Sequence, residues 1–317
     1  MRKLSIKKNP EMFQGEKYLS SDKDYFEGLY FKNTSGNIGI SFIPGISISK
    51  KERKAFIQVI TNESSYYVDY DINDFKFGNN PFYVSIGNSY FSKDRIHIDI
   101  RNDKQNLSVY GDLDYTDSKN IDTSEISPNI MGIFSYVPFM ECNHAVISMK
   151  HSIEGTISIN DREIVFNKGI GYIEKDWGIS FPSNYIWCQG NNFSDDSVSF
   201  MLSIADIPFK IFSFRGLICS LIIDNHEYRF ATYNGAKIVK YDINGNMISI
   251  VLKKGDYLLE VSAKYEDGFR LSAPVNGNMS RDIVESISSD ININLKNKKR
   301  SIFSDRSCNC GLEVVRE

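Results

Sequence analysis

The residues best suited to chemistry in this sequence are two carboxyl groups set among aromatic side chains. The stretch from Gly169 to Phe193 reads GIGYIEKDWGISFPSNYIWCQGNNF and holds both tryptophans of the chain. Glu174 and Asp176 lie two residues apart within it, so in a strand they would project from one face. A carboxyl group partly buried among aromatic rings has a raised pKa, and a protonated carboxyl group can act as an acid catalyst. The two acids could instead pair with Lys175 or an arginine and brace a domain junction.

Aromatic and amide side chains in the same stretch would suit a reaction that passes through a cation. Trp177, Trp187 and Tyr185 could turn their ring faces toward a developing positive charge and keep water away from it. Large rings are mostly buried in any protein, so these three could equally be core residues. Gln189 and Asn191 are also two apart, and their amides could orient a hydroxyl or carbonyl group of a ligand.

Two further acidic positions are candidates for ligand binding. Glu141 and His144 lie three residues apart in FMECNHAV, so in a strand they point to opposite faces unless a bulge intervenes. A single histidine in a strand is usually a structural residue with its hydrogen bonds satisfied. Glu27 and Tyr30 lie in a similar aromatic setting, where the alternative is an edge ion pair between Glu27 and Lys32.

The elements around these residues follow a β pattern. Apolar residues alternate with polar ones instead of recurring every three or four positions, as in the stretch from Ile96 to Ile100. Helical signals are few. Many short antiparallel strands over 317 residues imply two sandwiches or barrels, because stacked or closed sheets hide edges that would otherwise pair with other chains.

Turn signals predict where neighbouring strands are joined. Asn-Gly and Asp-Gly pairs tolerate positive φ and are strong hairpin signals. The predicted hairpins pair 238–243 with 247–252 around Asn244-Gly245, 156–159 with 164–166 around Asn160-Asp161, and 258–265 with 269–272 around Asp267-Gly268. The segment 279–287 is ambiguous between a short helix and a strand.

The charge balance argues against several classes of partner. With 37 Lys and Arg against 40 Asp and Glu, the net charge is -3, which does not fit a nucleic-acid binder that neutralises phosphates. The N-terminal residues lack the apolar core of a secretory signal, and no segment approaches the ~20 apolar residues that span a bilayer. We therefore expect a cytoplasmic protein without a transmembrane segment, and peripheral contact with a membrane stays compatible with the sequence.

The cysteines and histidines do not predict a metal site. Five scattered cysteines, an odd number, fit reduced thiols better than a disulfide scaffold. Cys308 and Cys310 are close together, but a Cys-x-Cys pair without a nearby histidine or second pair is a weak zinc signal. The four histidines show no ligand spacing, so we expect no metal and no other cofactor.

The stretch from Gly169 to Phe193 resembles the signature of the tocopherol cyclase-like family. In that signature G-Y-x-E-K-D-W-G-x-S-F-P is followed by W-x-Q and N-x-F, and every fixed letter is present. The family usually has tryptophan at the position of Leu29 and an aromatic residue at Asn143, so a cavity lined by these positions would be larger or more polar here. Other matching stretches extend the resemblance over nearly the whole chain: YFEGLYFK (25–32), FIPGI (42–46), MGIFSYVPFMECNHAVISM (131–149), SAPVNGNMSRDIVESI (272–287) and GLEV (311–314).

The resemblance implies an all-β protein of two lipocalin-like antiparallel units, residues 1–182 and 183–317, with a ligand cavity near their junction. It also implies an intramolecular cyclase of the isomerase or lyase type. Such an enzyme closes a ring on a prenylated or other lipophilic phenol by protonating an alkene, without a cofactor. Asp176 or Glu174 would donate the proton, and His144 would act as a base or orient another group.

A non-catalytic carrier is the main alternative, because closed β units hold apolar ligands without chemistry. A carrier has no need of a protonated carboxyl group facing its ligand, whereas an acid catalyst does. A purely structural or interaction protein would leave the paired acids and amides without a role. Together with the resemblance, the paired acids favour a cyclase whose substrate is a lipophilic small molecule.

Overall fold

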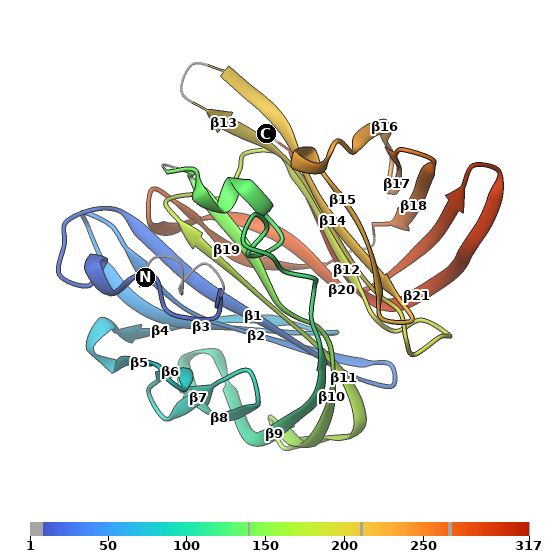
Figure 1. Ribbon diagram of the computed structural model, residues 1–317. Coiled ribbons are helices and arrows are strands. Elements are labelled where there is room, and N and C mark those ends of the chain that lie inside the picture. Colours follow the sequence, from blue (N-terminus) through green and yellow to red (C-terminus); the bar gives the residue numbers. More distant parts are fainter. Residues whose placement is uncertain (1–8, 139, 210–211, 266–267, 317) are drawn as a thin grey trace.

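The computed structural model describes residues 9–138, 140–209, 212–265 and 268–316, which form two large antiparallel sheets (Figure 1). The expected all-β fold with two antiparallel units is confirmed. No helix within these ranges is long and apolar enough to cross a membrane. The helical elements that they contain are short 3-10 segments: η1 (Glu16–Tyr18), η2 (Ile72–Asp74), η3 (Asp103–Gln105), η4 (Gly132–Tyr136) and η5 (Thr232–Asn234).

The first sheet is built from the first half of the chain in the order β4-β3-β2-β1-β11-β10-β9-β8-β7-β6-β5. Because β11 returns beside β1, the two strands that carry the candidate acids lie in the middle of the order. The strands are β1 (Tyr25–Ser35), β2 (Ile38–Ile48), β3 (Arg53–Thr61), β4 (Ser65–Asp71), β5 (Phe75–Asn79), β6 (Phe82–Ile86), β7 (Ser89–Phe91), β8 (Arg95–Asn102), β9 (Leu107–Lys119), β10 (Cys142–Ile159) and β11 (Arg162–Gly178).

The second sheet has the order β15-β14-β13-β12-β21-β20-β18-β17-β16, and β19 pairs with β20 outside this path. The chain leaves the first sheet at Gly178 and enters the second at Tyr185. A domain boundary at residue 182 stays a prediction. The strands are β12 (Tyr185–Gly190), β13 (Ser199–Phe209), β14 (Phe212–Ile223), β15 (His226–Ala231), β16 (Lys237–Asn244), β17 (Met247–Lys254), β18 (Tyr257–Lys264), β19 (Phe269–Val275), β20 (Asn278–Asn297) and β21 (Arg300–Val315).

Two of the three predicted hairpins are confirmed and the third is wrong in its pairing. Strands β16 and β17 pair directly, as do β10 and β11 around Asn160 and Asp161, both of which have positive φ. Strands β18 and β19 both form, but each pairs with a different half of the long strand β20. Asp267, in the predicted turn between them, lies outside the described residues. The ambiguous segment 279–287 belongs to β20 and is therefore a strand.

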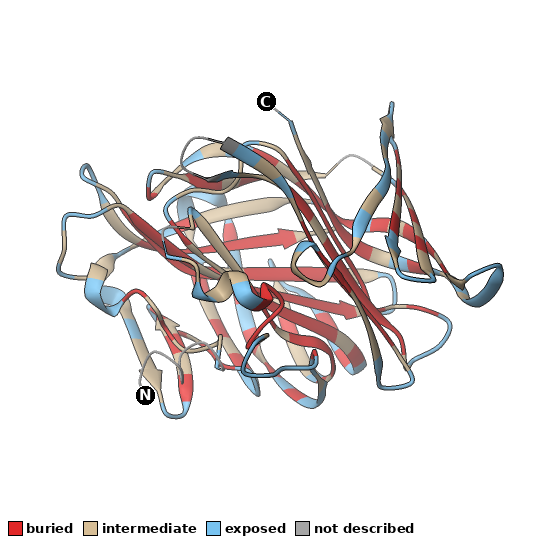
Figure 2. Ribbon diagram, turned by 45° about the horizontal axis from the view of Figure 1, so that its top comes forward, coloured by how far each residue is buried: buried red, intermediate tan, exposed pale blue. Residues whose placement is uncertain are grey.

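Buried apolar residues form one cluster on each sheet and a third cluster between the sheets. Figure 2 shows the buried residues running along the central strands of both sheets. Strand β11 is buried on both faces. Its even-numbered residue Tyr172 belongs to the cluster between the sheets, whereas Ile173 and Trp177 belong to the cluster of the first sheet. Alternation along β11 therefore sends Glu174 and Asp176 to one side and Lys175 to the other.

The odd-numbered face of β1 and β11 holds a buried ion pair. Lys175 Nζ lies 2.8 Å from Glu27 Oε1, and the two side chains are 0% and 3% exposed. Tyr25 donates a hydrogen bond to the same carboxylate at 2.6 Å, and the backbone N–H of Gln14 donates to it at 3.0 Å. Lys175 also donates to the carbonyl of Met12 at 2.7 Å. The pair thus ties the N-terminal segment to the centre of the first sheet.

We expect the substitution Glu27→Gln to lower the free energy of unfolding by about 3–5 kcal/mol, because it leaves the Lys175 charge buried without its counter-ion. Chemical denaturation monitored by circular dichroism measures this change. The matched control is Glu63→Gln, which removes the partner of Arg162 from an exposed pair at 2.8 Å and should cost less than about 1 kcal/mol. Equal losses in the two variants would contradict a structural role for the buried pair.

Candidate active site

Two rows of side chains face each other across the space between the sheets. On the first sheet, Tyr30 of β1 and Glu174 of β11 are register partners. On the second, Glu313 of β21 lies between its register partners Glu285 of β20 and Trp187 of β12. Hydrogen bonds join the rows, because Tyr30 donates to Glu285 and Trp187 Nε1 donates to Glu174 Oε2 at 3.0 Å. The pairing of strands far apart in the sequence therefore collects several acids at one place.

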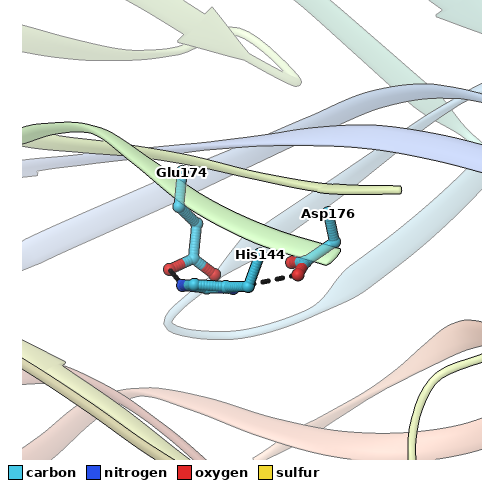
Figure 3. A group of neighbouring side chains, drawn as sticks. All are labelled: His144, Glu174 and Asp176. Atoms are coloured by element: carbon cyan, nitrogen blue, oxygen red, sulfur yellow. Dashed lines mark hydrogen bonds and ion pairs between the residues drawn. The ribbon is translucent and has the colours of Figure 1, made fainter. Parts of the chain in front are cut away.

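His144 lies between Glu174 and Asp176 in a group that β10 and β11 hold together (Figure 3). Its Nδ1 is 2.9 Å from Asp176 Oδ1, and its Nε2 is 3.4 Å from Glu174 Oε2. Burial opposes a charge on the imidazole, but the two carboxyl groups outweigh it and raise the pKa of His144 to about 9. The two neighbouring carboxyl groups therefore favour the imidazolium form of His144, and in that form the ring has no lone pair with which to act as a base.

Glu174 is buried beside hydrogen-bond donors from three strands. Tyr172 donates to Oε2 at 2.6 Å, Trp187 donates to the same atom, and His144 faces it as well. Burial raises the pKa of Glu174 to about 7, although the imidazolium acts in the opposite direction. Since these contacts all converge on Oε2, a proton on this carboxyl group would reside on Oε1. Glu174 can thus gain or lose a proton near neutral pH.

Two more acids in this region were missed by the sequence analysis. Tyr185 donates a hydrogen bond to Glu313 Oε2 at 2.5 Å, and burial raises the pKa of Glu313 to about 8. Glu285 is fully buried, and burial together with the neighbouring Glu313 holds its pKa well above the usual range. A sequence signal for Glu285 existed, because it alternates with Ile283 and Ile287 and so falls on an apolar strand face.

A cavity lies beside these groups, and its walls are mainly apolar. About 170 Å³ of it is open to the centres of water-sized molecules. Six of the candidate residues line it, and so does Glu313. The candidate residues in its wall are Tyr30, His144, Glu174, Asp176, Tyr185 and Trp187, and the apolar wall includes Phe26, Leu29, Ile43, Phe56, Met131, Phe134, Met140, Phe181, Ile207, Phe214, Leu217, Ile218, Leu271 and Ile283.

Two candidates lie on the opposite face of the first sheet, and their expected place in the cavity is corrected. Glu27 is held in the ion pair with Lys175. Trp177 packs against the core of the first sheet, with Lys175 Nζ 4.9 Å from its ring centroid. Glu27 and Trp177 each lie an odd number of positions along their strand from Tyr30 and Glu174, which face the second sheet, so their side chains point the other way. Alternation on each strand could be read from the sequence, but the face that each set occupies depends on the packing of the sheets.

Three other candidates also lie outside the cavity wall. Glu141, a predicted substrate-binding residue, is exposed just before β10 and is not among the described residues that line the cavity with His144. Asn191 is buried and donates to the carbonyl of Gly171 at 2.8 Å, and Gln189 is completely buried further along β12 from Trp187. Neither amide is among the described residues that line the cavity, so a role for Gln189 or Asn191 in orienting a ligand stays a prediction.

Among the described residues, His144, Glu174 and Asp176 are the only group of three or more His, Cys, Asp or Glu side chains with ligand-type atoms within 4.8 Å of one another. The two ring nitrogens of His144 point to different carboxyl groups, Nδ1 to Asp176 and Nε2 to Glu174. A metal ion would take one of these nitrogens and an oxygen of each carboxyl group. Because each nitrogen already has a carboxyl partner, the arrangement also fits a group that holds and moves protons.

Comparisons with known proteins agree with this fold. The sequence profile of the family described as Tocopherol cyclase-like matches residues 114–315, more than half of the chain. The structure of CghA is similar, with a TM-score of 0.56 and 8% identity over 93% of this chain and 89% of that chain. CghA with Sch210972 also has a TM-score of 0.56, with 7% identity over 93% and 89%. None of the curated proteins compared matches the sequence significantly.

A third similar structure comes from Nitrosomonas europaea and is assigned as AttH. Its TM-score is 0.54, with 10% identity over 95% of this chain and 96% of that chain. At these identities the likeness concerns the fold. It extends over nearly the full length of both proteins, so the two-sheet architecture is shared as a whole.

We expect Trp187 to report ligand binding and Trp177 not to, because Trp187 alone of the two lines the cavity. A hydrophobic ligand that occupies the cavity should therefore quench the fluorescence of the Trp177→Phe variant and leave that of Trp187→Phe nearly unchanged. Titration of both variants with the same ligand stock measures the difference. Quenching carried by Trp177 would contradict the assignment of the cavity.

We also expect the free energy of unfolding to fall as the pH rises from 6.5 to 9. The folded-state pKa values of His144, Glu174 and Glu313, about 9, 7 and 8, all exceed their ordinary values of 6.5, 4.5 and 4.5. Each group thus adds stability below its ordinary pKa and loses it as the pH passes its folded-state pKa. Urea denaturation across this range measures the slope. The double variant with Glu174→Gln and Glu313→Gln should flatten it, and a rising slope in the parent would contradict these pKa values.

Proposed function

The chain belongs to the tocopherol cyclase-like family, and on that premise we propose that it closes a ring on a prenylated or other lipophilic phenol by protonating an alkene. The observation that carries this proposal is the position of Glu174. Its carboxyl group has a pKa of about 7 and lines a largely apolar cavity. An acid with a pKa near the working pH is the best compromise between holding a proton and giving it up.

Ring closure of this kind is an isomerisation in which atoms and charge balance. The acid gives a proton to the less substituted alkene carbon, and the phenol oxygen bonds to the more substituted carbon. The phenol proton then leaves to a base. The cation that develops on the tertiary carbon would be sheltered by aromatic rings of the wall, among them Trp187 and Tyr185. No oxidant, reductant or co-substrate enters the balance.

The lining of the cavity favours an uncharged substrate. His144 is the one basic residue among the described residues that line it, and two carboxyl groups already neighbour it. A substrate carboxylate or phosphate would meet Glu174, Asp176 and Glu313 without a free cation to pair with. A lipophilic phenol brings no such charge. CghA, which has a similar fold, has been crystallised with Sch210972, which supports binding of a small molecule by this architecture.

We assign the proton donation to Glu174 and orienting roles to the other two members of the group. Asp176 accepts a hydrogen bond from His144 Nδ1, which fixes the ring so that Nε2 faces Glu174. The imidazolium charge would stabilise the carboxylate that remains after Glu174 has given up its proton. Membership of the family and the protonatable acids both favour this enzyme over a carrier, since a carrier gains nothing from a proton donor beside its ligand.

We expect Glu174→Gln to lower the turnover of geranylhydroquinone by ~100-fold to ~10,000-fold, the usual cost of losing a general acid, with little change in its affinity. The amide keeps the size of the side chain but has no proton to deliver. Asp176→Asn should cause a smaller loss, because it acts through His144. The isomeric product is separated from the substrate by liquid chromatography, and binding is measured by fluorescence.

The control for this comparison is Glu163→Gln, which changes an exposed glutamate at the start of the same strand. It should keep the parental rate and stability. If Asp176→Asn stops turnover while Glu174→Gln does not, Asp176 is the acid and Glu174 has the orienting role. If both variants convert the substrate at the parental rate, neither carboxyl group donates the proton, and the carrier becomes the better interpretation.

A further inference from the structure

Ring closure requires an acid and a base at the same time, and the group around His144 supplies only the acid. This step rests on the proposed function. Glu174 cannot hold a proton for the alkene and accept the phenol proton at the same moment. Both ring nitrogens of His144 already face carboxyl groups that favour its protonated form, and Asp176 is engaged with Nδ1, so another polar group of the cavity wall is better placed to act as the base.

We propose that Glu313 is the second catalytic carboxyl group and accepts the phenol proton from the wall formed by the second sheet. Glu313 lines the same cavity as Glu174 but belongs to β21. Its register partner Trp187 donates to Glu174, so the two acids flank one indole ring. Tyr185 donates to Glu313 Oε2 at 2.5 Å, which supports a negative charge on this carboxyl group and leaves Oε1 to take the proton.

The neighbour of Glu313 on β20 explains how Glu313 can exchange a proton beside a buried acid. Glu285 is the register partner of Glu313, so their side chains lie side by side on one face. Two adjacent carboxylates repel each other, so it is costly to ionise both. Glu285 is the more deeply buried, and burial raises its pKa well above the usual range. Glu285 thus keeps its proton, and Glu313 needs to accommodate only one negative charge.

The other polar groups of the wall are less suited to the role. Tyr185 already donates to Glu313, and burial raises the pKa of Tyr185 far above neutrality. Burial likewise raises the pKa of the Cys142 thiol, so little thiolate is present. Glu313 has a pKa of about 8 against about 7 for Glu174, so both proton arrangements are accessible near neutral pH.

The number of protons is conserved over one turnover. Glu174 gives its proton to the alkene carbon as the new C–H bond forms, and the C–O bond forms at the other alkene carbon. The phenol O–H bond breaks, and its proton goes to Glu313. Glu174 ends as a carboxylate and Glu313 as an acid, so a proton must pass from Glu313 to Glu174 before the next turnover. A water molecule that enters when the product leaves is sufficient for this transfer.

The test is the Glu313→Gln variant of the full chain, assayed with geranylhydroquinone. We expect a fall in turnover of ~100-fold or more with unchanged affinity, because the amide cannot accept the proton. Glu313→Asp, which retains a carboxylate, should recover part of the rate. Glu163→Gln on the exposed part of β11 is the control and should match the parent.

The pH profile separates a base from a merely structural residue. In the parent, the rate should rise as Glu313 ionises and fall as Glu174 loses its proton, which gives a bell-shaped curve. The titrating groups that neighbour Glu313 are Glu174, Asp176, His144, Glu285 and Tyr185. In Glu313→Gln, the rising limb should disappear and the falling limb should stay. A structural role would lower the rate without removing a limb.

The proposed cyclase activity and the role of Glu313 would be overturned by different results. A parent protein that binds geranylhydroquinone without converting it would contradict the proposed function. A parent that converts it, together with a Glu313→Gln variant that keeps the parental rate or the full bell-shaped profile, would contradict the role of Glu313 alone. Infrared spectra of the protonated carboxyl band add a readout without substrate. If Glu313 and Glu174 interact, Glu313→Gln should lower the titration midpoint of Glu174, and an unchanged midpoint would also overturn the inference.

Discussion

The centre of this molecule depends on the cost of placing carboxyl groups where water is excluded. Glu174 and Glu285 are buried between the sheets, and the half-buried Glu313 lies beside Glu285. An ionised carboxylate in such a place is unfavourable unless it is paired or hydrogen-bonded, and otherwise it takes up a proton. Each of the three receives a hydrogen bond from a tyrosine hydroxyl group: Glu174 from Tyr172, Glu285 from Tyr30 and Glu313 from Tyr185. These donors lessen the cost of burial without supplying a full counter-charge, so the acids keep raised pKa values.

Strand β11 links this chemistry to the stability of the fold. On one face it presents Glu174 and Asp176 to the space between the sheets, and on the other it presents Lys175 to Glu27. The buried charged groups on the two faces are compensated in different ways. Lys175 has a full counter-ion and close hydrogen-bond acceptors, whereas the acids are left to share protons with their neighbours. A strand fixed on one face by an ion pair can hold the groups on its other face in a constant position.

Much of the local structure could be predicted from the sequence, and the limits of that prediction are physical. Period-two alternation placed Glu174 and Asp176 on one face, and turn residues located the hairpins around Asn160 and Gly245. Alternation cannot tell which face of a doubly buried strand lies toward the partner sheet, so it could not show that Trp177 and Glu27 lie on the face away from that sheet. The sequence also does not reveal which strands pair over long distances, because β18 and β19 pair with different halves of β20 and not with each other. Glu313 gains its neighbours Glu285 and Trp187 only through such long-range pairing.

The two departures from the family pattern differ in their effect on the cavity. Leu29 lines the cavity and also packs in the core cluster of the first sheet, so the residue at this position affects the apolar wall. Asn143 does not line it, and its side chain donates to the carbonyl of Trp177 at 3.3 Å. The change at Leu29 leaves the hydrogen bonds among His144 and the acids untouched, because none of them involves β1 at this position. The apolar part of the ligand site can therefore vary in shape while the arrangement of proton-carrying groups stays the same.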